Sequence, residues 1–195
     1  MFLSPKPIWE ALTSSVLSGR VPMRLPGPWQ LMLLGDGSPT RHLNLLTGEE
    51  VKIELIGMEA EPNLKNNAPL EVLELNPPLI KRQVWLLCGT KTLAWAESWW
   101  NKAEADHHLK NKNEPIWQSL SKGRSELFRE VDGLALVEAP WLEKRFQTNG
   151  PFWSRHYRFF RHKTELTVIR EVFSPELELW LGDSLRQQLR ETNES

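Results

Sequence analysis

The sequence is poor in cysteine and tyrosine, and it has no long hydrophobic run. Its 195 residues include one cysteine, Cys88, and one tyrosine. No disulfide can therefore form within the chain, which fits a reducing compartment. No apolar stretch approaches the roughly 18 residues of a transmembrane helix, and the N-terminus lacks the charged start and apolar core of a signal peptide. These absences predict a cytoplasmic protein without a membrane span, in which Cys88 is a small core residue.

Net charge is the next thing that the sequence lacks. The formal charge is -1 at pH 7, so there is no overall attraction to nucleic acid or to anionic membranes. Any affinity for anions must come from locally placed arginine and lysine. With 40% apolar and 25% charged residues, the chain can form a globular core. The length predicts a single domain over residues 29–195, with residues 1–28 as a proline-rich arm packed on it.

Common catalytic and cofactor motifs are also missing. The sequence has no GxxxxGK[ST], GxGxxG or GxSxG pattern, so nucleotide binding and serine hydrolysis lack support. Its five histidines do not have the spacing of metal ligands, and we expect neither a metal nor a cofactor. A basic and aromatic stretch runs from Arg155 to Lys163. It suits single-stranded nucleic acid, a solvated strand face, or a small carboxylate ligand that needs one or two arginines. The overall charge argues against nucleic acid.

Periodicity and turn residues predict an α+β fold with a mostly antiparallel sheet and flanking helices. Two predicted hairpins are the main basis for this class. In the first, polar turn residues separate apolar runs at 81–88 and 93–100, and in the second they separate runs at 152–161 and 165–173. Further strands are expected at 51–58 and 131–139. Helices are expected at 9–17, 29–34, 101–113, 115–128 and 176–189. The ten tryptophans are interpreted mainly as bulky core residues, although they also suit the wall of a ligand pocket.

Two predicted strands each place one ionisable side chain on an apolar face. Arg82 shares its face with Val84 and Leu86, and Glu171 shares its face with Ile169 and Phe173. A charge in such a place must be paired, solvated or used. One interpretation is a structural salt bridge. The other is a pocket in which Arg82 binds a carboxylate bidentately and Glu171 contacts a hydroxyl group or moves a proton.

Three stretches of the chain resemble the chorismate–pyruvate lyase family, which makes 4-hydroxybenzoate for quinone synthesis. They are Ser38-Pro39-Thr40-Arg41, Arg82-Gln83-Val84-Trp85-Leu86 and Arg170-Glu171-Val172-Phe173-Ser174-Pro175. Between them, Glu114-Pro115-Ile116 resembles the start of a family helix, and Trp153-Ser154-Arg155 resembles the family's Trp-x-Arg. The likeness covers about residues 29–175 and depends on the order and spacing of the motifs together.

The resemblance implies an antiparallel sheet with helices, a closed pocket under two helical flaps, a monomer, and a reaction on chorismate without cofactor or metal. Arg82 would hold the ring carboxylate, with help from backbone N–H groups at Pro39 and Ile116. Glu171 would lie by the ring hydroxyl and take part in proton transfer. The pathway would lead toward ubiquinone or plastoquinone. By charge alone, Arg155 or Arg158 is a candidate for the pyruvyl carboxylate.

The sequence departs from this pattern at Pro39, because proline has no N–H to donate. Either Thr40 or a water molecule supplies that hydrogen bond, or the alignment is shifted by one residue. Fold also leaves function open. The same fold serves as a ligand-sensing domain in bacterial regulators, and a carrier of an aromatic ligand or a lyase acting on a related enolpyruvyl substrate would fit the same residues.

Overall fold

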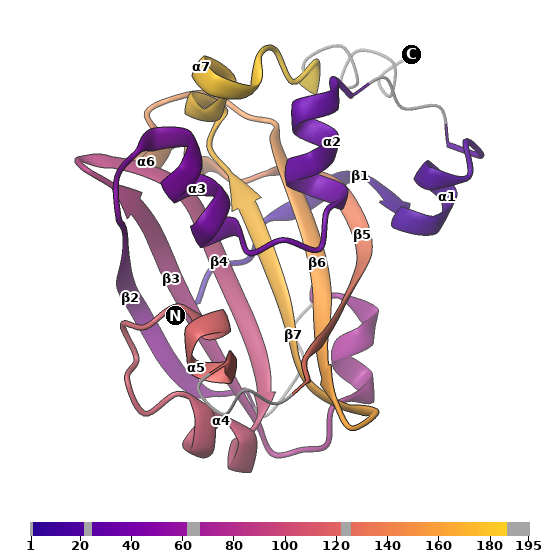
Figure 1. Cartoon of the computed structure of the whole chain (residues 1–195), viewed down its shortest axis with the longest axis vertical. Coiled ribbons are helices and arrows are strands. Elements are labelled where there is room, and N and C mark those ends of the chain that lie inside the picture. Colours follow the sequence, from indigo (N-terminus) through magenta and orange to yellow (C-terminus); the bar gives the residue numbers. More distant parts are fainter. Residues whose placement is uncertain (1, 22–24, 62–66, 122–125, 187–195) are drawn as a thin grey trace.

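A seven-stranded antiparallel sheet forms the centre of the computed structural model, which describes residues 2–21, 25–61, 67–121 and 126–186 (Figure 1). The strand order is β1-β5-β6-β7-β4-β3-β2. The strands are β1 (Lys6–Leu12), β2 (Val51–Ala60), β3 (Leu79–Cys88), β4 (Lys91–Asn101), β5 (Phe128–Glu138), β6 (Phe152–Arg161) and β7 (Thr164–Phe173). With its flanking helices, the sheet confirms the predicted α+β class.

Both expected hairpins are present, and their turns have the backbone conformation that tight turns demand. Gly89, between β3 and β4, has a φ of 56°, and His162 and Lys163, between β6 and β7, have φ values of 49° and 64°. Because β7 pairs with both β6 and β4, the two hairpins lie next to each other. Strands from residues 79–101 and 152–173 therefore form the middle of the sheet.

The N-terminal segment differs from its predicted structure. A helix was expected over residues 9–17, but Lys6–Leu12 form β1, which pairs with β5 at the edge of the sheet, and only α1 (Thr13–Leu17) is helical. An edge strand accommodates Pro7, because one side of it makes no ladder hydrogen bonds. The register of this pairing shifts between Pro7 and Trp9. Pairing with β5 therefore decides the structure of residues 6–12, and their local helix propensity does not.

Helices cover both faces of the sheet (Figure 1). One face carries α2 (Gly27–Leu34), α3 (Pro39–Thr47), α4 (Lys102–His108) and α5 (Ile116–Ser121), and the other packs against η1 (Leu70–Glu74) and α6 (Pro140–Phe146). Near the C-terminus, η2 (Pro175–Leu177) leads into α7 (Glu178–Leu181). Helix α6 was not predicted. The helix expected at 176–189 ends at Leu181, because Gly182 has a φ of 77°; residues 187–189 lie outside the described ranges.

Tryptophan side chains fill much of the core on both faces. Trp29 and Trp153 lie in the cluster under α2 and α3, whereas Trp95 and Trp99 lie on the opposite face. The indole N–H groups of Trp29 and Trp153 donate to the carbonyls of Gly182 and Ser184, which anchors the C-terminal segment. These side chains are core residues, as expected. In the described ranges, no helix is both long enough and apolar enough to span a membrane.

Candidate active site

A cavity lies between the sheet and the first turns of α3 and α5. Its walls come from three places that are far apart in the sequence. The α3 and α5 side contributes Ser38, Pro39, Thr40, Pro115, Ile116 and Trp117. The sheet contributes apolar residues and several polar ones, among them Arg82, Arg129, Tyr157 and Glu171. Arg41 lies over the ring of Trp117 at 5.9 Å, so α3 and α5 touch at the edge of the cavity.

Arg82 is a buried cation with no anionic partner among the residues that the structure describes. Its side chain is 3% exposed. Nε and Nη2 donate to the Lys112 carbonyl at 3.2 and 2.6 Å, and Nη2 also donates to the Glu114 carbonyl at 3.3 Å. Within the described part of the chain, Arg82 forms no ion pair, and burial lowers its pKa to about 10. The group is therefore charged at neutral pH and suited to an anionic ligand.

Glu171 is held by two donors on the neighbouring strand. In the antiparallel register, Arg155 lies directly opposite Glu171, and Tyr157 lies two residues further along β6 on the same face. Arg155 Nε contacts Glu171 Oε2 at 2.9 Å, and the Tyr157 hydroxyl donates to Oε1 at 2.8 Å. The salt-bridge interpretation therefore holds for Glu171, whose buried partner is Arg155. Arg82 and Glu171 do not pair with each other in the described ranges, and β4 separates their strands by two spacings, roughly 10 Å.

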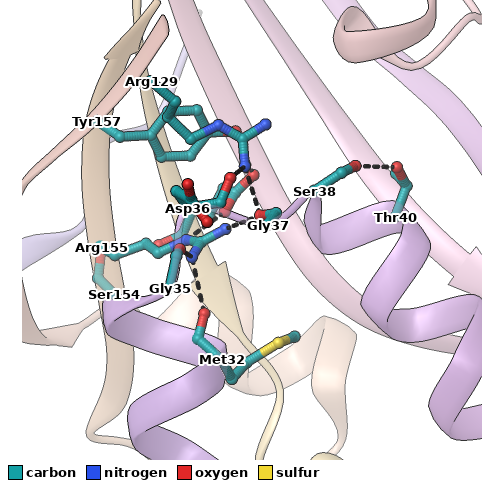
Figure 2. A network of polar contacts seen from close by, with 11 residues as sticks. Met32, Gly35, Asp36, Gly37, Ser38, Thr40, Arg129, Ser154, Arg155 and Tyr157 are labelled. Atoms are coloured by element: carbon teal, nitrogen blue, oxygen red, sulfur yellow. Dashed lines mark hydrogen bonds and ion pairs between the residues drawn. The ribbon is translucent and has the colours of Figure 1, made fainter.

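Arg155 also fixes the loop between α2 and α3 (Figure 2). Its side chain is fully buried, and it donates to the carbonyls of Met32, Gly35 and Gly37. The loop passes close to His42: a Cβ atom at Gly37 would lie 2.2 Å from His42 Nε2, so any larger residue would displace that side chain. Burial, followed by the charges of Arg155 and Arg129, lowers the pKa of His42. The loop thus delivers Ser38 and Thr40 to the cavity in one fixed conformation.

Arg129 lies on the far side of the same loop (Figure 2). Its Nη1 donates to the carbonyls of Asp36 and Gly37. The guanidinium group stacks on Tyr157 and Phe159, with its carbon 4.7 and 4.6 Å from the ring centres. Its Nε is buried and has no hydrogen-bond partner in the described part of the chain. Arg129 is therefore a second cation of the cavity that has spare donor capacity.

The structure brings together most of the residues that the sequence singled out. Arg82, Pro39, Thr40, Ile116 and Glu171 all line the cavity. Pro39 is the first residue of α3, and Thr40 follows it with its Oγ1 2.8 Å from the Ser38 hydroxyl. Backbone N–H groups in the first turn of a helix have no acceptor within the helix. Since Pro39 has no N–H, the N–H of Thr40 is the first one in α3 that could donate to a ligand.

The two arginines considered for the pyruvyl carboxylate lie elsewhere. They are three residues apart on β6 and hence point to opposite faces of the sheet. Arg158 pairs with Asp132 at 2.7 Å and also contacts Glu74 and Glu130. Arg155 faces the correct side, but Glu171 and the loop carbonyls occupy its donors. Charge alone was too weak a criterion, because it ignored the alternation of strand side chains.

Arg129 and Tyr157 are the site residues that sequence reasoning missed. The strand predicted at 131–139 begins three residues earlier, at Phe128, so Arg129 fell outside it. The sequence did contain a signal for Arg129. On a strand, Arg129 shares its face with the apolar residues Leu127 and Val131, so it is another single cation on an apolar strand face. Tyr157 was noted only as one of several aromatics.

A metal site has no support in the described ranges, which contain no group of three or more His, Cys, Asp or Glu side chains suitable for an ion. The chemistry of the cavity is instead that of two cations, one ion-paired carboxylate and apolar walls. Such a cavity suits a small aromatic or ring-shaped anion with a hydroxyl group.

Comparisons with known proteins find relatives of this chain in sequence and in fold. A family model described as "Chorismate pyruvate-lyase Rv2949c-like" matches residues 33–181. A protein titled "Uncharacterized protein ycf21" from Cyanophora paradoxa is 33% identical over 150 residues, which are 75% of this chain and 77% of that protein. The protein of the same title from Porphyra purpurea is 33% identical over 155 residues, which are 79% and 84% of the two chains.

Among solved structures, the effector domain of PhnF from Mycobacterium smegmatis has a similar fold. Its TM-score is 0.55 with 10% sequence identity, and the match covers 74% of this chain and 93% of that domain. At this identity the likeness concerns the fold alone.

Proposed function

Because this chain belongs to the Rv2949c-like chorismate pyruvate-lyase family, we propose that it converts chorismate into 4-hydroxybenzoate and pyruvate. One observation carries the proposal: Arg82 is a buried, charged guanidinium in the wall of an apolar cavity, and it has no ion-pair partner among the described residues. A group of this kind costs stability unless a ligand uses it. The ring carboxylate of chorismate would supply the missing anion, with Arg82 Nη1 as the donor that no described residue occupies.

The positions of Arg82 and Glu171 suit opposite ends of one ring. With the carboxylate at Arg82, the C4 hydroxyl would reach toward Glu171, which lies two strands away. Glu171 already accepts hydrogen bonds from Arg155 and Tyr157, one on each of its two carboxyl oxygens. We therefore assign Glu171 as an acceptor: it anchors the ring hydroxyl or takes the ring proton, rather than acting as a general acid.

The reaction needs little beyond this arrangement. The C4 hydrogen leaves as a proton, its bonding electrons form the third ring double bond, and the C3–O bond to enolpyruvate breaks. Enolpyruvate then gains a proton and becomes pyruvate. Aromatisation makes the step favourable, so orientation in a dry pocket and one proton acceptor suffice. The product would feed quinone synthesis, as the family's role implies.

The test is to incubate the purified protein with chorismate in EDTA and to quantify 4-hydroxybenzoate and pyruvate by chromatography. Equal amounts of the two products are expected. Glu171→Gln should lower kcat by about 100-fold or more, because general-base catalysis contributes that much, whereas Arg82→Gln should lower both affinity and turnover.

Arg145→Gln is the matched control, because Arg145 pairs with the exposed Glu54 on the surface and should leave activity unchanged. Thermal unfolding of each variant separates lost chemistry from lost structure. Saturable binding of 4-hydroxybenzoate without any product would contradict the lyase and indicate a sensor or carrier. Absence of both product and binding would reject a ligand site in this cavity.

A further inference from the structure

Two cations line the cavity, but the ring of the proposed substrate offers only one carboxylate. Arg82 comes from β3 and Arg129 comes from β5. Neither forms an ion pair with any residue in the described ranges, whereas Arg155 and Arg158 on β6 both do. A second arginine in one small cavity, also without an ion-pair partner in the described ranges, points to a second negative charge on the ligand.

The sheet places the two arginines on opposite sides of the cavity. Strands β4, β7 and β6 lie between β3 and β5, so the two backbones are about 19 Å apart along the sheet. Glu171, on β7, lies between them. The strand register also separates them along the strands. Following the paired residues across the sheet from Arg82 leads to Tyr157 on β6, whereas Arg129 pairs with Phe159, two residues further along β6. The order across the cavity is cation, carboxylate, cation.

The donors of Arg129 are only partly used. Nη1 is occupied by the loop carbonyls of Asp36 and Gly37. Nε is buried without a partner, and Nη2 donates to no described residue. Stacking on Tyr157 and Phe159 holds the plane of the guanidinium group in place. The side chain therefore loses less conformational entropy when a ligand binds.

We propose that Arg129 binds the carboxylate of the enolpyruvyl side chain, so that the site selects a dianion held at both ends. This inference rests on the proposed lyase function and names the feature of the substrate that the far side of the cavity recognises. Chorismate has one carboxylate on the ring and one on the C3 side chain, next to the C4 hydroxyl. Its three polar groups match the order Arg82, Glu171 and Arg129.

Two stable ligands that differ in the second carboxylate test this assignment. One is 3-(carboxymethoxy)benzoate, and the other is 3-methoxybenzoate. Binding of each is measured by calorimetry with the wild type, Arg129→Gln, Arg129→Lys and the surface control Arg145→Gln. Loss of a charged hydrogen bond predicts that Arg129→Gln weakens binding of the dicarboxylate by about 10- to 100-fold. Binding of the monocarboxylate should change by less than about 3-fold, and Arg129→Lys should recover part of the loss.

An equal loss for both ligands would overturn the proposal, because it would reduce Arg129 to a support of the 35–38 loop. No loss for either ligand would overturn it as well. Chorismate turnover is measured on the same proteins. A selective loss for the dicarboxylate without any turnover would keep Arg129 as an anion site and reject the lyase, whereas turnover with an unselective loss would keep the lyase and reject this role for Arg129.

Discussion

At the scale of single residues, the charged groups inside the sheet fall into two classes. Arg155, Arg158 and Arg170 each have a carboxylate partner, and their charges serve the fold. Arg82 and Arg129 lack one in the described part of the chain, and both line the same cavity. Since an unpaired buried charge weakens the fold, these two arginines are the ones for which a ligand gives the best physical reason.

Glu165 gives a prediction about pH at this scale. Its side chain is 10% exposed, Arg158 Nη1 is 4.0 Å away, and its Oε1 is buried with no hydrogen-bond partner among the described residues. Burial raises the pKa of Glu165 from 4.5 to about 7. Between these values the folded chain binds more protons than the unfolded chain, so the contribution of this group to stability falls as pH rises through that window.

Glu165→Gln should therefore stabilise the protein at pH 8, because it removes a buried charge. Tm should rise by about 2–4 °C for each kcal/mol gained in the free energy of unfolding. The gain should shrink toward pH 5, where Glu165 is protonated in the folded state. Calorimetric melting curves of both proteins from pH 5 to 8 check this. A gain that is constant over the whole range would mean that Glu165 does not titrate in this window.

At the scale of elements, a buried polar cluster joins three strands on the face opposite the cavity. Glu97 on β4 contacts Lys81 Nζ at 2.9 Å and Gln83 Nε2 at 2.9 Å on β3, and Arg170 Nε at 2.7 Å on β7. Gln83 also donates to the carbonyl of Leu3, and Lys81 donates to the Ser4 hydroxyl. The N-terminal segment is thus attached to the middle of the sheet as well as to β5, the strand that pairs with β1.

Glu97→Gln should lower the free energy of unfolding by about 3–5 kcal/mol, because it leaves two buried cations without a counter-ion. Urea denaturation at pH 7 measures this effect. The matched control is Glu54→Gln, which removes an exposed partner of Arg145 and should cost at most about 1 kcal/mol. Similar costs for the two variants would show that the cluster is not a main anchor of the sheet.

At the scale of the whole molecule, the cavity is formed only when the sheet and the two helices on one face come together. Its lining comes from α3, α5 and six of the seven strands. The family match over residues 33–181 confirms the resemblance found in the sequence motifs. A ligand that neutralises Arg82 should stabilise the entire fold, because the unfolded chain offers no equivalent site.

We expect 4-hydroxybenzoate at 100 times its Kd to stabilise the protein by about 2.7 kcal/mol, which raises Tm by roughly 5–10 °C. The shift should be the same in EDTA, and Arg82→Gln should abolish it. Differential scanning fluorimetry with benzoate and 4-hydroxybenzoate side by side also measures the contribution of the hydroxyl group. An unchanged shift in Arg82→Gln would place the ligand elsewhere.

The parts of the fold that the sequence predicted are those with strong local signals. Both central hairpins, β2 and α2 follow from alternation and turn residues in adjacent segments. β1 and α6 could not be predicted in this way, because β1 is a strand only through its pairing with β5 and α6 is short. In the site, Arg82 and Glu171 stood out as lone charges on apolar strands, and the same criterion would have found Arg129 with a correct start for β5.

The sequence by itself determined which residues can carry charge into the interior, since alternation assigns each strand side chain to a face. It also determined the α+β class and the family. Only the tertiary structure decided which charges are neutralised: β4 keeps Arg82 away from Glu171, while the β6–β7 register places Arg155 beside Glu171. Ion pairing depends on distances of a few ångströms between strands that are far apart in the chain, and strand order sets those distances.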